Sequence, residues 1–322
     1  MKLGVFTVLF QDLMFEDMLD RVKAYGIDAI EIGTGGYPGD SHCPVDLLLS
    51  DEQSRKKYMS AIQQRGLTIS ALSCHGNPLH PNKQTAQGYH DSWRKTVMLA
   101  SKLEVETVIG FSGCPGDSPL SKSPNWVTCA WPPDYLETLD WQWQEVAIPY
   151  WKEEEEFARS LGVKIALEMH PGFLVYNPET CLKLREQTGP NIGANLDPSH
   201  LFWQGIDAAE AVRILGQKEA LFYFHAKDTS ISKRNVAQNG VLDPKSYTDW
   251  LNRSWTFRSV GWGHDTPVWK EIISSLRMVG YDKVISIEHE DGLASTHEGL
   301  SKSVGFLKEI ILTEDPTDAW WV

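Results

Sequence analysis

The sequence predicts one closed (β/α)8 barrel, a TIM barrel, that takes up residues 1–322 as a single domain. Strand-like and helix-like segments alternate from one end of the chain to the other. The strand-like runs are short, mostly apolar and show little alternation, which is typical of parallel strands covered on both faces. Composition does not shift along the chain, and the length fits a barrel of about 250 residues with insertions.

The predicted strands are eight short apolar runs. They are Leu3–Leu9, Ala29–Gly33, Thr68–Cys74, Thr107–Ser112, Lys164–Met169, Ile192–Leu196, Leu221–Ala226 and Val284–Glu288.

The segments between these runs show helical periodicity. In the first of them, Phe15, Met18 and Val22 share one face, and Gly26 ends the pattern. The predicted helices are Phe15–Tyr25, Ser50–Arg65, Gln144–Ser160, Pro178–Gln187, Asp207–Leu215, Thr266–Val279 and His297–Leu312. A strand followed by a helix, repeated along the whole chain, favours a closed barrel over an open doubly wound sheet.

The bulk composition excludes several classes of partner. A formal net charge of −13 argues against a nucleic-acid partner, which needs a basic surface. No run approaches the roughly 18 apolar residues of a membrane span, and the N-terminus leads directly into a strand without a signal pattern. We therefore expect a cytoplasmic protein. The five cysteines, without a CxxC pair, indicate reduced thiols rather than disulfides or a thiolate zinc site.

Two insertions interrupt the regular alternation, at about residues 113–143 after the fourth strand and 229–263 after the seventh. Loops that follow barrel strands lie on the catalytic face, so both insertions are expected to wall the active site. The first is rich in aromatic residues, among them Trp126. Such rings either pack a loop cover or an oligomer interface, or they form a platform for a sugar ring or an aromatic group.

Four predicted strands end in a potential metal ligand: Glu168, Asp197, His225 and Glu288. Acids and imidazoles at the ends of buried strands are costly unless they are paired or bind a cation. A shared set on four strands therefore predicts a metal centre at the mouth of the barrel. Three carboxylates and one imidazole suit Mn²⁺ best, with Mg²⁺, Co²⁺ and Zn²⁺ as alternatives.

A second polar residue follows three of these ligands at a spacing of two, which places both side chains on one side of a strand. The pairs are Glu168 with His170, His225 with Lys227, and Glu288 with Glu290. Glu290 therefore competes with Glu288 for the role of eighth-strand ligand. We favour Glu288 because it directly ends the apolar run.

A metal with open positions would bind a substrate carbonyl and an adjacent hydroxyl. It would polarise the carbonyl and stabilise the enolate that forms when a neighbouring proton leaves. A carboxylate beside that carbon would act as the base, and its conjugate acid would return the proton.

The segments IALEMHPG, NLDPSHLFW, FHAKD, VGWGHD and GYDKVISIEHED resemble motifs of the xylose isomerase-like barrels. That group includes sugar phosphate isomerases and epimerases, ketose 3-epimerases and inosose dehydratases, and the resemblance covers essentially the whole chain. It implies that Glu168, Asp197, His225 and Glu288 are the metal ligands and that His200 contacts a substrate oxygen. It also implies that Glu168 and Glu288 exchange protons on opposite faces of the substrate.

Other candidate residues have structural alternatives. His75 ends the third strand and is a candidate acid or base, as is His170, which alternatively orients a ligand. Lys227 would bind an oxyanion or pair with Asp228. Arg258 and His264, in the second insertion, are candidate substrate contacts. No phosphate-binding loop and no cluster of basic residues is visible, so an unphosphorylated substrate is expected.

The sequence thus predicts a metal-dependent isomerase or epimerase acting on an unphosphorylated sugar or keto-sugar. The alternative rests on a resemblance to the larger subunits of enzymes that cleave 3-oxo-glycosides of aromatic compounds, including C-glycosides, by metal-assisted elimination. Expected partners are a carbohydrate or glycoside and a second copy of the chain, or a small second subunit in the alternative. A DNA repair enzyme of the same superfamily fold is excluded by charge, and a scaffold without metal is disfavoured by the four ligands.

Overall fold

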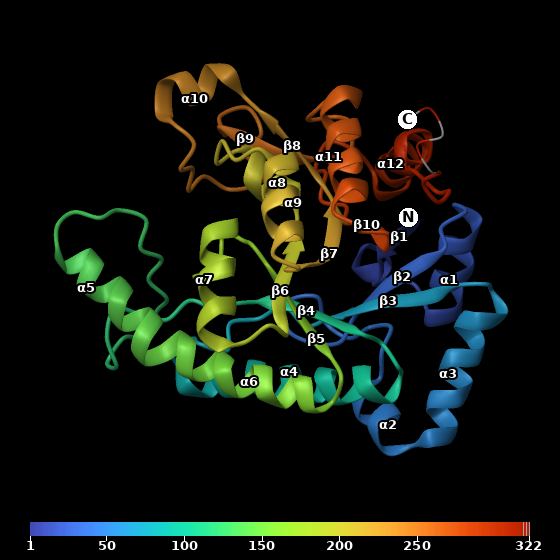
Figure 1. Cartoon of the computed structure of the whole chain (residues 1–322), viewed down its shortest axis with the longest axis horizontal. Helices are drawn as coiled ribbons and strands as arrows, with labels where there is room; N and C mark the ends of the chain where they lie inside the picture. Colours follow the sequence, from blue (N-terminus) through green and yellow to red (C-terminus); the bar gives the residue numbers. More distant parts are fainter. Residues whose placement is uncertain (318, 320, 322) are drawn as a thin grey trace.

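The computed structural model describes residues 1–317, 319 and 321, and its centre is a closed barrel of eight parallel strands (Figure 1). The predicted fold class is confirmed. Neighbouring barrel strands follow one another in chain order, and the last pairs with the first. The barrel strands are β1 (Lys2–Phe6), β2 (Ala29–Gly33), β3 (Thr68–Ser73), β4 (Thr107–Phe111), β5 (Lys164–Glu168), β6 (Ile192–Leu196), β7 (Leu221–Ala226) and β10 (Val284–Ile287).

Three of the predicted strands, β2, β6 and β7, have the predicted bounds. The first prediction, Leu3–Leu9, is wrong in its second half, because β1 ends at Phe6 and Thr7–Phe10 form the 3-10 helix η1. The turn buries Thr7, whose hydroxyl donates to the Glu31 carbonyl at 3.0 Å.

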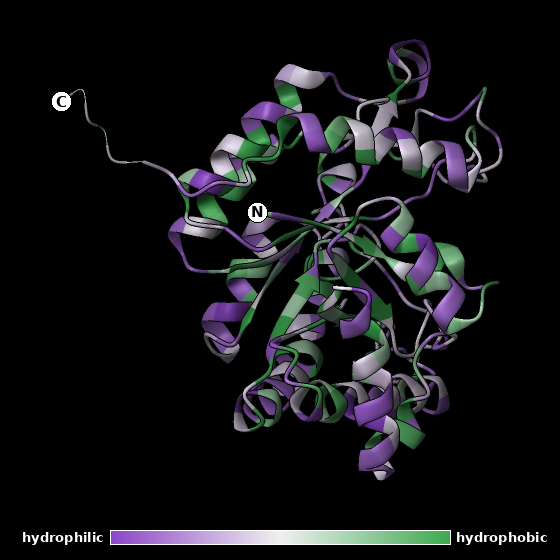
Figure 2. Cartoon of the chain, turned by 90° about the vertical axis from the view of Figure 1, so that its right-hand side faces the viewer, coloured by the Kyte–Doolittle hydropathy of each residue, from purple (hydrophilic) through white to green (hydrophobic). Residues whose placement is uncertain are grey.

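The helices surround the barrel and turn their apolar faces inward. Figure 2 shows hydrophobic strands in the middle of the molecule and hydrophilic turns on the outer faces of the helices. The helices are α1 (Phe15–Ala24), α2 (Val45–Ser50), α3 (Glu52–Gln64), α4 (Lys83–Lys102), α5 (Asp134–Trp141), α6 (Ile148–Ser160), α7 (Pro178–Thr188), α8 (Pro198–Phe202), α9 (Ala208–Gln217), α10 (Lys233–Asn239), α11 (Thr266–Met278) and α12 (Thr296–Ile310). Among the described residues, no helix is both long enough and apolar enough to cross a membrane.

The sequence analysis did not predict α4, the longest of these helices. The side chain of Asn82 caps its start by accepting from the backbone N–H groups of Gln84 and Thr85. Its first half is polar, and its buried residues begin only at Trp93, so the apolar stripe covers half of the helix.

The inside of the barrel is arranged in layers, as expected for side chains from alternate positions of parallel strands. Ala71, Ile109, Ala166 and Tyr223 are buried together in a small apolar cluster. Two residues further along the same strands, the side chains become Ser73, Phe111, Glu168 and His225. Strand parity therefore places a polar layer directly above an apolar floor.

Both insertions contain secondary structure. The first carries α5, none of whose residues is buried, and continues through the π-helical turn Gln142–Ala147 into α6. The second folds as a two-stranded antiparallel sheet of β8 (Asp228–Ile231) and β9 (Trp255–Arg258), with α10 between them. Figure 1 shows α5 at the left end of the molecule and α10 at its upper left.

The buried carboxylate of Asp228 holds the second insertion onto the barrel. Its Oδ2 accepts from the backbone N–H groups of Gly261, Gly263 and His264, each at 3.0 Å. The indole of Trp269 donates to the same oxygen at 3.2 Å. A carboxylate that accepts several N–H groups fixes the loop that supplies them.

Replacing Asp228 with Asn is expected to lower the free energy of unfolding by about 3 kcal/mol, because an amide leaves several of these buried donors poorly satisfied. Urea unfolding followed by circular dichroism measures the change. Asp265→Asn is the matched control, since Asp265 is exposed and makes no side-chain capping bond. That control should change stability by less than about 0.5 kcal/mol, and equal effects of the two substitutions would contradict the prediction.

Candidate metal centre

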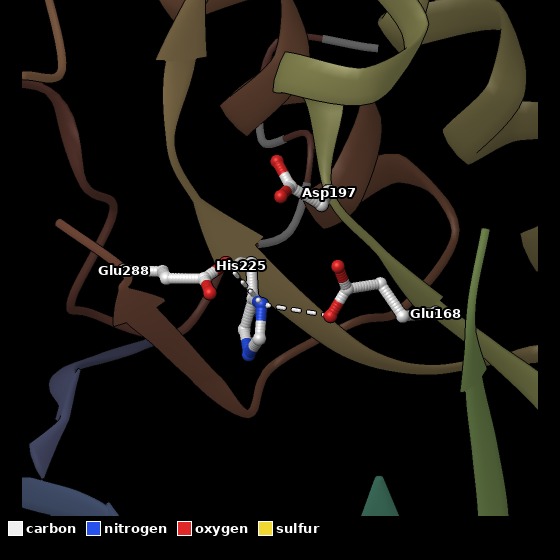
Figure 3. Close-up of side chains that lie close together, drawn as sticks. All are labelled: Glu168, Asp197, His225 and Glu288. Atoms are coloured by element: carbon white, nitrogen blue, oxygen red, sulfur yellow. Dashed lines mark ion pairs between the residues drawn. The ribbon is translucent and has the colours of Figure 1, made fainter. Parts of the chain in front are cut away.

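Four side chains converge at the carboxyl end of the barrel, and each offers one ligand atom within 4.8 Å of the other three. Glu168 is the last residue of β5, and His225 lies one residue before the end of β7. Asp197 directly follows β6, and Glu288 directly follows β10. Figure 3 shows the four side chains pointing toward a common centre, with His225 between Glu168 and Glu288.

The spacing fits a single ion, because opposite ligands of one cation lie about 4 to 5 Å apart when each bond is about 2.0 to 2.6 Å. Three of the four side chains are buried, and Glu288 is 12% exposed. Glu290, the competing candidate, lies outside this set and is 50% exposed. The geometry therefore favours Glu288 over Glu290 as the eighth-strand ligand.

The ring of His225 is oriented by a buried carboxylate on the neighbouring wall of the barrel. Its Nε2 lies 2.9 Å from Oε2 of Glu31, and its Nδ1 lies 3.1 Å from Oε2 of Glu288. The hydroxyls of Ser73 and Ser286 donate to Glu31 at 2.5 and 2.7 Å and hold it in place. A proton on Nε2, donated to Glu31, leaves Nδ1 free to act as a ligand.

In this arrangement, burial opposes a charge on the His225 ring, but the Glu31 and Glu288 carboxylates raise its pKa well above its usual value. A proton therefore competes with a metal cation for Nδ1 of His225.

Glu168 is surrounded by hydrogen-bond donors. The Nε2 atoms of His75 and His200 lie 2.9 and 3.1 Å from its two oxygens, and the Asn195 amide donates to it at 3.2 Å. Burial would raise the pKa of Glu168, but the surrounding imidazoles hold it well below its usual value. Glu168 is therefore an ionised carboxylate with a fixed orientation.

Lys227 balances part of the acid at the centre. Its ammonium lies 3.0 Å from Asp197, 2.8 Å from Glu288 and 3.1 Å from Glu290. Burial disfavours the ammonium, yet these carboxylates raise the pKa of Lys227 well above its usual value. Burial likewise opposes the charge on Glu288, whose pKa Lys227 and His225 lower strongly.

The residues at the centre fit a divalent cation. Oδ2 of Asp197 is buried and receives no hydrogen bond of suitable geometry from any described residue. Its contacts are ion pairs, with Lys227 at 3.0 Å and with Nε2 of His200 at 3.2 Å, and three converging carboxylates with one imidazole are a donor set that a divalent cation would fit. The cluster is thus a candidate carboxylate and histidine site for a divalent metal.

A cavity of about 290 Å³ opens directly over this cluster. Its walls include Glu168, Glu288, Lys227 and His75, so the two outer ligands face the space that a substrate would fill. Aromatic residues complete the wall, with Phe111 edge-on to His75 at 4.6 Å between ring centroids. The predicted candidate His75 is therefore part of the centre.

His170 lies beyond the end of β5 and lines three adjoining cavities, including the central one. Its ring centroid is 4.1 Å from that of His200. Burial and the neighbouring His200 and Lys227 lower the pKa of His170 to about 3, so its ring is neutral at pH 7. Nδ1 lies 2.6 Å from the Pro171 carbonyl, which leaves Nε2 as an acceptor.

The structure places the remaining predicted substrate contacts differently. Trp126 lines a second cavity of about 510 Å³ together with His170 and His200. Arg258 instead pairs with Asp291 at 3.1 Å, and His264 binds Asp228 at 2.9 Å. Neither Arg258 nor His264 is brought to the cluster, because both are used to hold the second insertion in place.

Two further residues of the centre, Glu31 and Asn195, are not predicted by the polar strand ends. Glu31 stands in the apolar strand AIEIG, and Asn195 precedes Asp197 by two positions. A charged residue in the middle of a buried strand was a usable signal. The pattern of polar strand ends does not include it, because Glu31 lies in the middle of β2.

Comparison with known proteins places this centre in a wider group. A family model described as "Xylose isomerase-like TIM barrel" matches residues 19–310. The "Uncharacterized protein YfiH" of Bacillus subtilis (strain 168) is 43% identical over 314 residues, which cover 97% of this chain and 99% of that protein.

Solved structures of similar fold include a D-tagatose 3-epimerase-like protein, 22% identical, with a TM-score of 0.64 over 96% of this chain and 97% of that one. The IOLI protein with a bound zinc atom is 17% identical and has a TM-score of 0.63 over 97% of this chain and 98% of that one. These likenesses agree in fold with the family match, which spans most of the sequence. The chain belongs to the xylose isomerase-like TIM barrel family.

Proposed function

We propose that the protein is a divalent-metal-dependent isomerase or epimerase that acts on an unphosphorylated sugar or keto-sugar by moving a proton next to a carbonyl. The observation that carries this proposal is the convergence of Glu168, Asp197, His225 and Glu288 under a cavity of about 290 Å³. Sugar epimerases among proteins of similar fold support the reaction class. The zinc atom of the IOLI protein, a structure of similar fold, supports a divalent metal as the cofactor.

When bound, a divalent cation would supply Lewis-acid polarisation of the substrate carbonyl. The oxygen-rich donor set suits Mn²⁺, Mg²⁺ or Co²⁺, and the imidazole also suits Zn²⁺. We favour Mn²⁺.

Glu168 and Glu288 are the residues that would move the proton. Both line the central cavity, and both have a lowered pKa, so they are ionised at neutral pH. One carboxylate takes the proton from the carbon next to the carbonyl, and the electron pair of that C–H bond becomes the enolate double bond. Inversion follows when the opposite carboxyl group, after taking up a proton from water, delivers it to the other face of the same carbon. Proton delivery to the former carbonyl carbon, with loss of the proton of the neighbouring hydroxyl, gives the isomer.

Neighbouring side chains would position the sugar hydroxyls. His200 and His75 touch Glu168, and Lys227 touches Glu288, so each carboxylate has a fixed donor beside it. Neutral His170 offers an acceptor nitrogen to a hydroxyl at the rim. These contacts orient the substrate without taking the proton from carbon.

An unphosphorylated substrate is supported by the charges of the cavity walls. Among the described residues that line the three adjoining cavities, Lys227 is the one lysine or arginine. It is already paired with three carboxylates. A phosphate group would meet acid there rather than the cluster of donors that it needs.

Elimination from a 3-oxo-glycoside is the second candidate, and the aromatic cavity beside the centre favours it. The same carboxylate would remove the proton, and the resulting enolate would expel the group on the next carbon, with a histidine such as His170 near the leaving atom. Release of a free phenol from an aryl 3-oxo-glucoside, instead of an epimer, would distinguish this outcome.

Hydrogen exchange tests the proposal directly. The protein is freed of metal with EDTA, reloaded with Mn²⁺, Mg²⁺, Co²⁺ or Zn²⁺, and incubated with unphosphorylated ketoses in deuterated buffer. Proton NMR is expected to show deuterium entering next to the carbonyl only in metal-loaded samples. No exchange with any sugar in the panel, while metal analysis shows a bound ion, would contradict the proposal.

Glu288→Gln is expected to reduce the exchange rate by at least about 100-fold, because it removes a carboxylate that both holds the cation and moves the proton. Glu290→Gln is the matched control two residues away, and it should reduce the rate by less than about tenfold. Rates from the same NMR assay decide between them. Equal losses in the two variants would refute the assignment of Glu288.

Glu31→Gln is expected to weaken metal binding by about 10- to 100-fold, because His225 loses the carboxylate that orients its ring. Titration calorimetry with Mn²⁺ measures this without any substrate. Glu106→Gln removes a carboxylate that pairs with Lys164 and Lys283 near the opposite ends of the strands, and should leave the affinity unchanged. An unaltered affinity in Glu31→Gln would show that the ring is held by its other contacts.

A further inference from the structure

A cavity of about 510 Å³ adjoins the candidate metal centre and is larger than the central cavity of about 290 Å³. Its walls come from both insertions, with Trp126 from the first and Tyr247 and Trp255 from the second. His170 and His200 complete it on the side of the centre. These two imidazoles, 4.1 Å apart, therefore form the boundary between the two spaces.

The walls of the larger cavity present flat apolar rings. Trp203 and Trp255 stack with their centroids 4.7 Å apart and their planes inclined by 5°. Tyr247 meets Trp255 edge-on at 5.9 Å, and Trp126 meets Tyr176 in the same way at 5.5 Å. Arg253 lies over the rings of Tyr247 and Trp255 at 4.3 and 4.5 Å, and Trp203 covers Trp255. Among these rings, the partly exposed Trp126 is therefore best placed to pack against the apolar face of a planar or chair-shaped ring.

Two hydrogen-bond donors in these walls have no partner. The indole N–H groups of Trp126 and Trp203 are buried and make no hydrogen bond to any described residue. Trp203 itself is only 6% exposed, so bulk water does not easily satisfy its donor. Buried donors in native proteins are normally satisfied, so each indole would gain from an acceptor oxygen that a small shift of its ring brings within reach.

The larger cavity is close to neutral. Besides the two histidines, Asp243 is the one ionisable group among its described lining residues, apart from the tyrosine hydroxyl. The oxygens of Asp243 already accept from Lys245 at 2.9 Å and from the Ser254 backbone at 2.6 Å. A charged ligand would find no free counter-ion there, whereas a neutral ring needs none and would bind without that cost.

We propose that this cavity is a subsite for a second ring, so that the substrate is a glycoside rather than a free monosaccharide. The inference rests on the proposed function, because it needs the reacting sugar to lie in the central cavity. The second ring has an apolar face and acceptor oxygens. A second sugar and an aromatic aglycone both have this chemistry.

A third cavity, of about 490 Å³, shares His170 and Tyr247 with the larger one. It is lined by Trp250 and by the half-exposed carboxylate of Glu290. No unpartnered buried donor occurs among its described lining residues. Trp250 in this cavity therefore provides a control position in the second insertion.

Calorimetric binding of matched glycosides tests the subsite on the full-length protein. The panel pairs methyl glycosides of glucose, galactose, mannose and xylose with their phenyl glycosides and with the corresponding disaccharides. At least one second ring is expected to tighten binding by about tenfold, the size expected for a stacked ring with one satisfied donor. The phenyl and disaccharide arms show whether the preferred second ring is an aglycone or a sugar.

Three variants test whether the increase in affinity arises in this cavity. Trp126→Ala should abolish it, and Trp203→Phe, which keeps the ring and removes only the donor, should reduce it by about threefold. Trp250→Ala, in the third cavity, should leave the gain intact. Circular dichroism confirms that each variant is folded, and Trp203→Phe keeps the test valid if Trp126→Ala does not fold.

The subsite is overturned if no second ring improves binding, including the case in which nothing in the panel binds, or if the gain survives in Trp126→Ala. The binding and exchange assays together distinguish a failure of the subsite from a failure of the proposed function. A second-ring gain in a protein that exchanges no substrate proton would keep the subsite and remove the isomerase. Exchange with free ketoses and no second-ring gain would keep the isomerase and remove the subsite.

Discussion

The neutralisation of buried acid at the carboxyl end of the barrel is the constraint on which the rest of the site depends. Glu31, Glu168 and Asp197 are fully or almost fully buried, and Glu288 is nearly so. Lys227 and His225 face them as cationic groups, and the imidazoles of His75 and His200 contact Glu168. Buried carboxylates in excess of their counter-ions are unstable unless a further cation is present. A divalent metal would supply that positive charge. The need for it would explain why side chains from four strands converge at one point.

The barrel interior and the insertions contribute to the site in different ways. The apolar floor, with Ile109 and Tyr223, fills the barrel below the polar layer and fixes the strand positions. Above it, the Asp228 carboxylate gathers backbone N–H groups and so ties the second insertion to the end of β7. The candidate ligands thus lie at or directly after the ends of strands, where positions are well defined, and the aromatic walls lie mainly on loops, where positions are less constrained.

The imidazoles of His170 and His200 connect the two parts. His200 touches Glu168 at the centre and also lines the aromatic cavity, and His170 borders all three spaces. A substrate that crossed this boundary would place its reacting carbons over the carboxylates and its second ring among the indoles. Proton transfer and ring recognition would then be performed by different elements of the fold.

The sequence by itself determined the barrel and the identity of the clustered ligands. Strand period, strand length and polar strand ends are local signals, and they led to Glu168, Asp197, His225 and Glu288. It did not determine α4, whose apolar stripe covers only its second half, or the sheet that β8 and β9 form within the second insertion.

Only the tertiary structure decided which other residues join the centre. It turned Glu31 toward His225, across 194 positions in the chain, and it committed Arg258 and His264 to other acids. It also placed Trp126 from the first insertion and Tyr247 and Trp255 from the second around one cavity. The physical reason is that the spacing of residues along a strand specifies which face a side chain takes. The partner it meets there depends on strands and loops that are distant in the chain.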